Sequence, residues 1–208
     1  MYYPIILQEV QEGLSLYLPE PGSVKTVYEQ LLDKDPKVTF PFWAKIWTSA
    51  IALADFLRTE PEWVRGKRVL ELGAGIGLPS FSVAKQAAEM IISDHAPEAV
   101  ALIAQNIQYL ELANAQARLI DWNHFPSDIV TDVVLLSDVN YAPEQFEALL
   151  TLIRKLLEQG TVILLATPQR ITASPFAEAL QAFIKRSFLQ TVPAKEQGMD
   201  IRILILHS

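Results

Sequence analysis

The sequence contains no cysteine among its 208 residues. Disulfide frameworks, thiolate nucleophiles, cysteine-ligated zinc and iron–sulfur clusters are therefore excluded. The longest uninterrupted apolar run covers only Ala99 to Ala104, whereas a membrane-spanning helix needs roughly 20 apolar residues. The first residues, MYYPIILQEV, show neither the basic segment nor the long apolar stretch of an export signal. These absences predict a cytoplasmic protein that does not use a membrane.

Positive charge is also scarce, with 17 basic against 24 acidic side chains and a formal net charge of −7. Nucleic-acid binding rests on Lys and Arg neutralising phosphates, so this balance argues against a nucleic acid as the main partner. No repeat, low-complexity tract or proline-rich linker divides the chain. We therefore expect one domain over residues 1–208 and a monomer.

From about residue 66 onward, short β-branched or Leu-rich runs alternate with segments of helical period. This alternation predicts an α/β fold, a Rossmann-like doubly wound sheet with helices on both faces. Prolines at 79, 97, 143 and 175 fall at the expected first turns of helices, where a missing N–H costs nothing. The expected strands are Arg68 to Leu72, Met90 to Ser93, Ala117 to Ile120, Val133 to Ser137 and Val162 to Thr167.

The two ends of the chain have different patterns. The stretches Phe188 to Val192 and Ile201 to His207 are separated by a segment too short for a crossover helix. They should therefore pair antiparallel and complete a seven-stranded sheet that is mostly parallel. Near the amino terminus, Ile5 to Val10 and Leu14 to Leu18 predict a hairpin, followed by a helix over Val24 to Leu32. We interpret residues 1–60 as a cap on a core formed by residues 61–208.

The most informative segment is VLELGAGIGLP, in which a buried strand runs into Gly73, Gly75 and Gly77. Such a turn lets bare backbone approach a ligand beyond the carboxyl end of the strand. A tight turn without a ligand is the alternative, but Asp94 ends the next strand, 17 residues beyond Gly77. An acidic side chain there is suited to hydrogen-bond both hydroxyls of a ribose.

The ligand is unlike a dinucleotide. The dinucleotide fingerprint needs its third glycine at the position of Leu78, and no phosphate-binding GK[ST] follows the turn. Glu71 would repel a pyrophosphate but suits the ammonium group of an amino acid, directly or through water. A ligand with both a ribose and a cationic tail fits better, and S-adenosylmethionine has both.

The E-x-G-x-G-x-G turn and Asp94 resemble those of the class I S-adenosylmethionine-dependent methyltransferases. Three further motifs resemble the seven-strand protein-lysine methyltransferases that modify chaperones, elongation factors and electron-transfer flavoprotein. They are FPFWAKIWTSAIALADFL, the pair Asp121 and Trp122, and SDVNY beginning at Ser137. The resemblance covers about residues 40–208.

The resemblance implies a set of residues around S-adenosyl-L-methionine and an acceptor that is a protein lysine or a small amine. Glu71 and the turn Gly73, Ala74 and Gly75 would hold the methionine moiety, and Asp94 the ribose. Asp121 and Trp122 would border the adenine, Ser137 would offer backbone, and Trp47 would close over the cofactor from the cap.

Asp138 and Tyr141 lie just past the fourth strand of the predicted core, where such sheets place reacting groups. Asp138 is suited to orient an incoming amine by accepting its hydrogen bond, and Tyr141 to line the opening with its ring face. The alternative is that Asp138 caps a loop and Tyr141 packs in the core. We take the catalytic interpretation for both residues.

Other candidates are weaker. Trp43 and Trp47 have the spacing of one helical face, which by itself is typical of core packing. His95, His124 and His207 lack the spacing of metal ligands, so we expect no metal site. Asp128 and Asp132 are interpreted as surface charges.

There are three alternatives to protein-lysine methylation, and the sequence disfavours two of them. A nucleic-acid methyltransferase is disfavoured, because the residues after Asp138 lack the prolines that grip an extruded base and the net charge is negative. A small-molecule N-methyltransferase is compatible with every motif. A cofactor-binding scaffold without activity is disfavoured, because the predicted cofactor and acceptor residues occur together in one chain.

Overall fold

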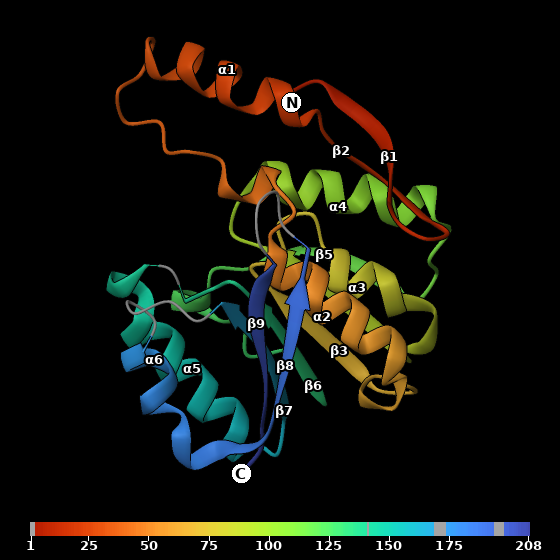
Figure 1. The fold of residues 1–208 in the computed structure, drawn as a ribbon, viewed down its shortest axis with the longest axis vertical. Helices are drawn as coiled ribbons and strands as arrows, with labels where there is room; N and C mark the ends of the chain where they lie inside the picture. Colours follow the sequence, from red (N-terminus) through yellow and green to blue (C-terminus); the bar gives the residue numbers. More distant parts are fainter. Residues whose placement is uncertain (1–2, 141, 169–173, 194–197) are drawn as a thin grey trace.

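The protein was analysed as a computed structural model that describes residues 3–140, 142–168, 174–193 and 198–208. A seven-stranded sheet forms its centre, and a two-stranded hairpin lies outside that sheet (Figure 1). The strands of the central sheet are β3 (Arg68–Leu72), β4 (Glu89–Asp94), β5 (Ala115–Leu119), β6 (Val133–Ser137), β7 (Val162–Pro168), β8 (Ile184–Val192) and β9 (Met199–Leu206).

The strand order is β5-β4-β3-β6-β7-β9-β8, and the pairs from β5 to β7 are parallel. Strand β9 lies between β7 and β8 and is antiparallel to both. The order in which the chain adds strands reverses between β3 and β6, which are neighbours within the sheet. Because these two strands are parallel, their carboxyl ends lie beside each other. In an open sheet a ligand binds at such a switch point. The predicted seven-strand, mostly parallel, Rossmann-like fold is confirmed.

Helices cover both faces of the sheet. On one face lie α2 (Thr48–Thr59), α3 (Leu78–Val83) and α4 (Pro97–Tyr109), and on the other α5 (Phe146–Glu158) and α6 (Ser174–Ala179) (Figure 1). Neighbouring residues of a strand belong to opposite layers: Val133 and Leu135 pack under α2 and α3, whereas Val134 and Leu136 pack under α5. Because both faces of β6 are buried, its residues Val133 to Leu136 are all apolar rather than alternating with polar ones.

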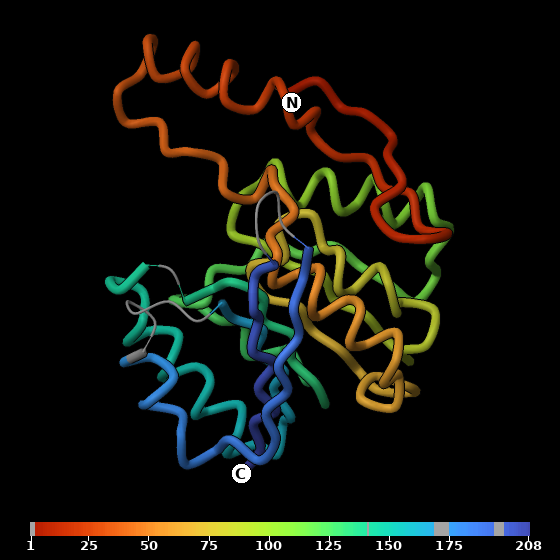
Figure 2. Tube along the Cα trace, in the orientation of Figure 1, coloured from red at the N-terminus to blue at the C-terminus, as the bar shows by residue number. Residues whose placement is uncertain are grey.

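An N-terminal arm precedes this core. It consists of the hairpin β1 (Ile5–Gln11) and β2 (Leu14–Pro19), the helix α1 (Pro21–Leu32) and the connection to the short helix η1 (Phe42–Ala44). In Figure 2 the chain runs along α1 away from the sheet and then turns back to reach η1. The hairpin and the helix are therefore as the sequence predicts.

The hairpin is fixed to α4 by one buried side chain. The carboxamide of Asn106 accepts the Tyr17 N–H (2.7 Å) and donates to the Tyr17 carbonyl (2.9 Å). It thus satisfies both backbone groups of a strand residue, as a neighbouring strand would. The rings of Tyr17 and Tyr109 add an edge contact at 5.1 Å between centroids.

One local expectation is wrong. Trp43 and Trp47 do not share a helical face, because Trp43 lies in η1 and the backbone is extended at Lys45 and again at Trp47, where α2 begins. No helix within the described ranges is both long and apolar enough to cross a membrane.

We expect Asn106→Ala to lower the free energy of unfolding by about 1–3 kcal/mol, because it leaves two backbone groups of Tyr17 without partners. Urea unfolding measures this change. Gln116→Ala is the control, since the exposed Gln116 carboxamide donates to the Glu89 side chain at the surface and its loss should cost no more than about 0.5 kcal/mol. Equal effects for the two variants would contradict the role of Asn106.

Candidate active site

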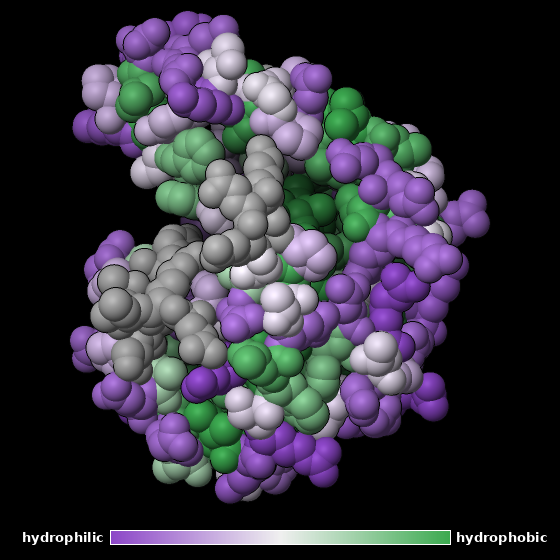
Figure 3. All heavy atoms as spheres, viewed as in Figure 1, coloured by the Kyte–Doolittle hydropathy of each residue, from purple (hydrophilic) through white to green (hydrophobic). Residues whose placement is uncertain are grey.

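A cavity of about 1000 Å³ lies where β3, β4 and β6 end, beneath the segment that joins α1 to α2. In Figure 3 the molecule is hollowed on the left, below the N-terminal arm. Three groups of residues line the cavity. The loops after the strands form its floor, and η4 (Trp122–His124) and η5 (Pro143–Gln145) form one side. Residues 37–47 form its roof. The cavity is large enough for a nucleoside cofactor together with part of an acceptor.

The predicted site residues converge on this cavity with one exception. All of the described ones except Glu71 line it: Trp47, Gly73, Ala74, Gly75, Asp94, Asp121, Trp122, Ser137 and Asp138. Tyr141 lies outside the described residues. Lys37, Val38 and Thr39 also line the cavity, but no motif in the sequence pointed to them. Phe40, Pro41 and Phe42 line it too, and they belong to the FPFW motif, from which no site role was predicted for them.

The glycine turn forms the floor in a conformation that side chains rarely adopt. Gly73, Gly75 and Gly77 all have positive φ, at 64°, 57° and 82°. A Cβ on Gly73 would lie 3.2 Å from Val139 and 3.3 Å from Trp122, and one on Gly75 would lie 3.1 Å from the Trp43 carbonyl oxygen. Glycine is thus required both for the backbone angles and for the space.

Asp94 joins the floor to the end of the next strand. Its Oδ2 accepts the Gly75 N–H (2.8 Å) and its Oδ1 accepts the Ala96 N–H (2.9 Å), with the side chain only 4% exposed. The His95 ring lies 3.2 Å from the same Oδ1, and this contact raises the pKa of His95. A carboxylate oxygen has two lone-pair sites, so Oδ2, which accepts only from Gly75 among the described residues, still has room to accept a ligand hydroxyl.

Glu71 lies beneath the turn rather than in the cavity. It is fully buried, its Oε2 accepts the Ser80 N–H at the start of α3 (3.1 Å), and its Oε1 has no hydrogen-bond partner in the part of the chain that the structure describes. Burial raises the pKa of Glu71 to about 7, opposed by the hydrogen bonds from Ser80. The carboxyl group therefore sits under the segment that the resemblance assigns to the methionine moiety.

Trp47 and Trp122 both border the cavity, and the indole N–H of each is held by a hydrogen bond. Trp122 donates to Oε1 of Gln145 (3.1 Å), a contact between residues 23 positions apart. Trp47 donates to the Phe42 carbonyl (2.9 Å), and the Lys45 ammonium lies 4.5 Å from the centroid of the Trp47 ring. Both rings are thereby fixed at the cavity wall, where a flat aromatic surface suits an adenine ring or a cationic side chain.

Asp121 and Asp138 place carboxylates at the same cavity. Asp121 accepts the Asn123 N–H (2.9 Å) and contacts His124, and these contacts lower its pKa. Asp138 follows β6 directly, is 7% exposed, and has a positive φ of 55°. That conformation turns the chain sharply at the end of the strand, next to Ser137 in the cavity wall.

The family model for lysine methyltransferases matches residues 39–187, which is most of the chain. This chain belongs to the lysine methyltransferase family.

Curated members of the family are clearly related in sequence. The human histone-arginine methyltransferase METTL23 is 32% identical over 161 residues, which is 74% of this chain and 84% of that protein. The mouse protein of the same name is 31% identical over 148 residues, which is 68% of this chain and 58% of that protein. The calmodulin-lysine N-methyltransferase of Arabidopsis thaliana is 33% identical over 67% of this chain and 47% of that protein.

Solved structures agree with the fold. The N-methyltransferase NodS from Bradyrhizobium japonicum, in complex with S-adenosyl-L-homocysteine, matches 86% of this lysine methyltransferase family member with a TM-score of 0.63. The match covers 98% of the NodS chain at 13% identity, so it concerns the fold alone. The chain has the fold of S-adenosylmethionine-dependent methyltransferases.

The residues of the cavity fit that cofactor. The floor offers bare backbone at Gly73 and Gly75, and a buried carboxylate at Asp94 suits the ribose hydroxyls. Trp122 supplies a fixed aromatic edge beside the floor. When bound, S-adenosylmethionine supplies an electrophilic methyl group. Among the described residues no group of His, Asp and Glu side chains could hold a metal ion.

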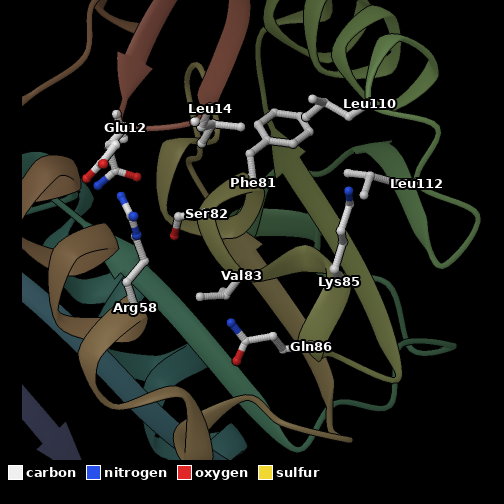
Figure 4. Close-up of a pocket in the computed structure, with 12 residues that line it drawn as sticks. Glu12, Leu14, Arg58, Phe81, Ser82, Val83, Lys85, Gln86, Leu110 and Leu112 are labelled. Carbon is white, nitrogen blue, oxygen red and sulfur yellow. The ribbon is translucent and has the colours of Figure 1, made fainter.

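A second, smaller cavity of about 300 Å³ lies away from this site, between the hairpin tip, the end of α2 and α3 (Figure 4). Arg58 reaches from α2 toward Glu12, and Lys85 lies across the cavity near Leu112. It shares no lining residue with the larger cavity. We assign it no role in this family member.

We expect Asp94→Ala to weaken S-adenosylmethionine binding by about 2 kcal/mol, or roughly 30-fold, through the loss of charge-assisted hydrogen bonds. Isothermal titration calorimetry measures the affinity. Asp128→Ala serves as the control, because its exposed carboxylate pairs with Arg118 outside the cavity. An affinity unchanged by Asp94→Ala would remove Asp94 from the cofactor site.

We expect the stability of Glu71→Gln relative to the native protein to rise with pH. The folded protein holds the Glu71 proton up to about pH 7, whereas an unfolded glutamate loses it near 4.5. The contribution of Glu71 to the free energy of unfolding therefore falls as the pH rises across this interval, by on the order of 3 kcal/mol in total. Glutamine does not titrate, so the variant does not lose this stability. Urea unfolding of both proteins between about pH 4.5 and pH 8 measures the difference. A difference that stays constant would show that Glu71 is ionised in the fold.

Proposed function

We propose that this protein transfers a methyl group from S-adenosylmethionine to a side-chain nitrogen of a protein, with lysine as the acceptor. The observation that carries the proposal is the position of Asp138. Its buried carboxylate borders the same cavity as the glycine turn and Asp94, so the residues suited to a cofactor and to an acceptor amine face one space. The family model supports lysine as the acceptor.

The charges around the cavity also favour a cationic acceptor. The acidic side chains come from the core: Asp94, Glu98, Asp121, Asp138 and Glu144. The two lysines that line the cavity, Lys37 and Lys45, belong to the roof. A lysine side chain approaching between roof and core thus meets a wall of mainly negative charge, which attracts it and disfavours polyanions.

The transfer forms an N–C bond and breaks the S–C bond of the sulfonium, whose sulfur keeps the electron pair. The nitrogen must first lose a proton, because a lysine ammonium has no lone pair. Asp138 would accept a hydrogen bond from the amine and aim its lone pair at the methyl carbon, and Tyr141 would line the opening. The low exposure of Asp138 excludes water that would compete for that hydrogen bond.

Arginine is the second candidate acceptor. Similarity to the histone-arginine methyltransferase METTL23 extends over 74% of this chain, more than to the calmodulin-lysine enzyme. A guanidinium would use the same acidic wall and the same carboxylate. A small amine is the third candidate, because the size of the cavity does not require a protein.

The test is methyl transfer with tritium-labelled S-adenosylmethionine to calmodulin, to core histones and to a fractionated lysate. Acid hydrolysis of the labelled protein followed by amino-acid analysis separates methyl-lysine from methyl-arginine. Label in methyl-lysine supports the proposal. Label in methyl-arginine would show that arginine, not lysine, is the acceptor, and label in the small-molecule fraction would show that the acceptor is a small amine. Cofactor binding without transfer to any acceptor would support a scaffold without activity.

A cytoplasmic location and a monomeric state belong to this proposal. Both rest on the sequence, and fractionation of cells and light scattering would test them. The absence of a nucleic acid and of a membrane among the partners is likewise a prediction, supported by the net charge of −7.

We expect Asp138→Asn to keep cofactor affinity and to lower the transfer rate roughly 100-fold or more, since small misplacements of reacting groups cost about that much. Calorimetry and transfer assays on one preparation measure both quantities, with Asp128→Asn as the control. Parallel loss of binding and transfer would make Asp138 a cofactor ligand, and loss of neither would refute its catalytic role.

A further inference from the structure

A buried pair of polar side chains lies behind Asp138. The hydroxyl of Thr167, near the end of β7, is 2.9 Å from Oδ1 of Asn140, in the loop after β6. The two residues are 6% and 1% exposed. The contact holds in either orientation of the Asn140 carboxamide, because a hydroxyl both donates and accepts. Neither residue lines the cavity.

This contact closes a short loop that carries Asp138. The Asp138 N–H donates to the Ala166 carbonyl (3.0 Å), which extends the pairing of β6 with β7 by one residue. Two residues later the Asn140 side chain reaches the next residue of β7, Thr167. The segment from Asp138 to Asn140 is thus attached to β7 at both ends.

The chain keeps this loop although its local structure is unfavourable. Asp138 adopts a left-handed backbone, which is uncommon for a residue with a Cβ, although Asp tolerates it better than most. The Nδ2 of Asn140 is buried and has no hydrogen-bond partner among the described residues. Such features persist where the surrounding structure enforces them, and they concentrate at functional sites. Between them, Val139 packs against the glycine turn near Gly73.

We propose that Thr167 is a positioning residue for methyl transfer: by holding Asn140, it fixes the conformation in which Asp138 faces the acceptor. This inference rests on the proposed function. Thr167 contacts neither cofactor nor acceptor, so its loss should change the rate of the chemical step and leave cofactor affinity unchanged. The hydrogen bond, rather than the volume of the side chain, carries the effect.

The first test compares Thr167→Val, Thr167→Ser and Thr161→Val. Thr161 is the matched control, since its hydroxyl is also buried, precedes the other end of β7 and donates to the Thr131 carbonyl (3.1 Å). On whichever of calmodulin or core histones the native protein methylates, we expect Thr167→Val to lower kcat about tenfold or more with KM and cofactor affinity within twofold. Thr167→Ser should restore kcat to within threefold, and Thr161→Val should leave it unchanged. Equal loss in the two valine variants, or no rescue by serine, would overturn the proposal.

The second test needs no acceptor. Amide hydrogen exchange followed by mass spectrometry reports on peptides that cover residues 136–140. We expect exchange in this segment to accelerate several-fold in Thr167→Val and to stay at the native rate in Thr161→Val. Unchanged exchange in Thr167→Val overturns the inference whatever the protein methylates. Accelerated exchange, with no acceptor methylated by the native protein, upholds the loop attachment and refutes the proposed function instead.

Discussion

The carboxylate of Asp94 connects the two loops on which the cavity floor depends. Strands β3 and β4 are parallel and pair Leu72 with Ser93, so their carboxyl ends emerge side by side. One buried side chain at the end of β4 can therefore reach the turn after β3 through Gly75 and its own loop through Ala96. The Gly75 N–H would otherwise be buried without a partner. The left-handed glycines permit this close approach, and the cavity opens where the two loops separate.

The roof is held by a different kind of interaction. Residues 37–47 contribute no strand to the sheet, and aromatic contacts attach them: Tyr3 packs on Trp43 with ring centroids 5.7 Å apart, and Tyr28 packs on Phe40 at 5.2 Å. In α1 only Val24 is buried. A segment with few buried contacts opens at lower free energy than the sheet does. Floor and roof thus combine a rigid backbone frame with a more weakly attached cover, an arrangement suited to admitting a large acceptor.

The sequence predicted features that depend on neighbouring residues. The strands, the helix starts and the glycine turn follow from local patterns. Asp94 and Asp138 could then be placed near that turn, because parallel strands end at one edge of the sheet. Contacts between distant residues carried no local signal: Gln145 holds Trp122 across 23 positions, and Arg68 pairs with Asp132 across 64. The interpretation of Trp43 was wrong for a different, local reason, since an extended backbone at Lys45 interrupts the helical spacing.

The boundary of the family match separates the first 38 residues from the rest of the site. The match to the lysine methyltransferases begins at residue 39, so it includes the floor, the acidic wall and most of the roof. The arm before residue 39 is not covered by that match, yet Tyr3, Leu31 and Lys37 from the arm line the same cavity. Asn106 and the aromatic contacts hold the arm in place. The part of the site suited to cofactor binding thus lies within the family match, whereas the opening above it also depends on residues outside that match.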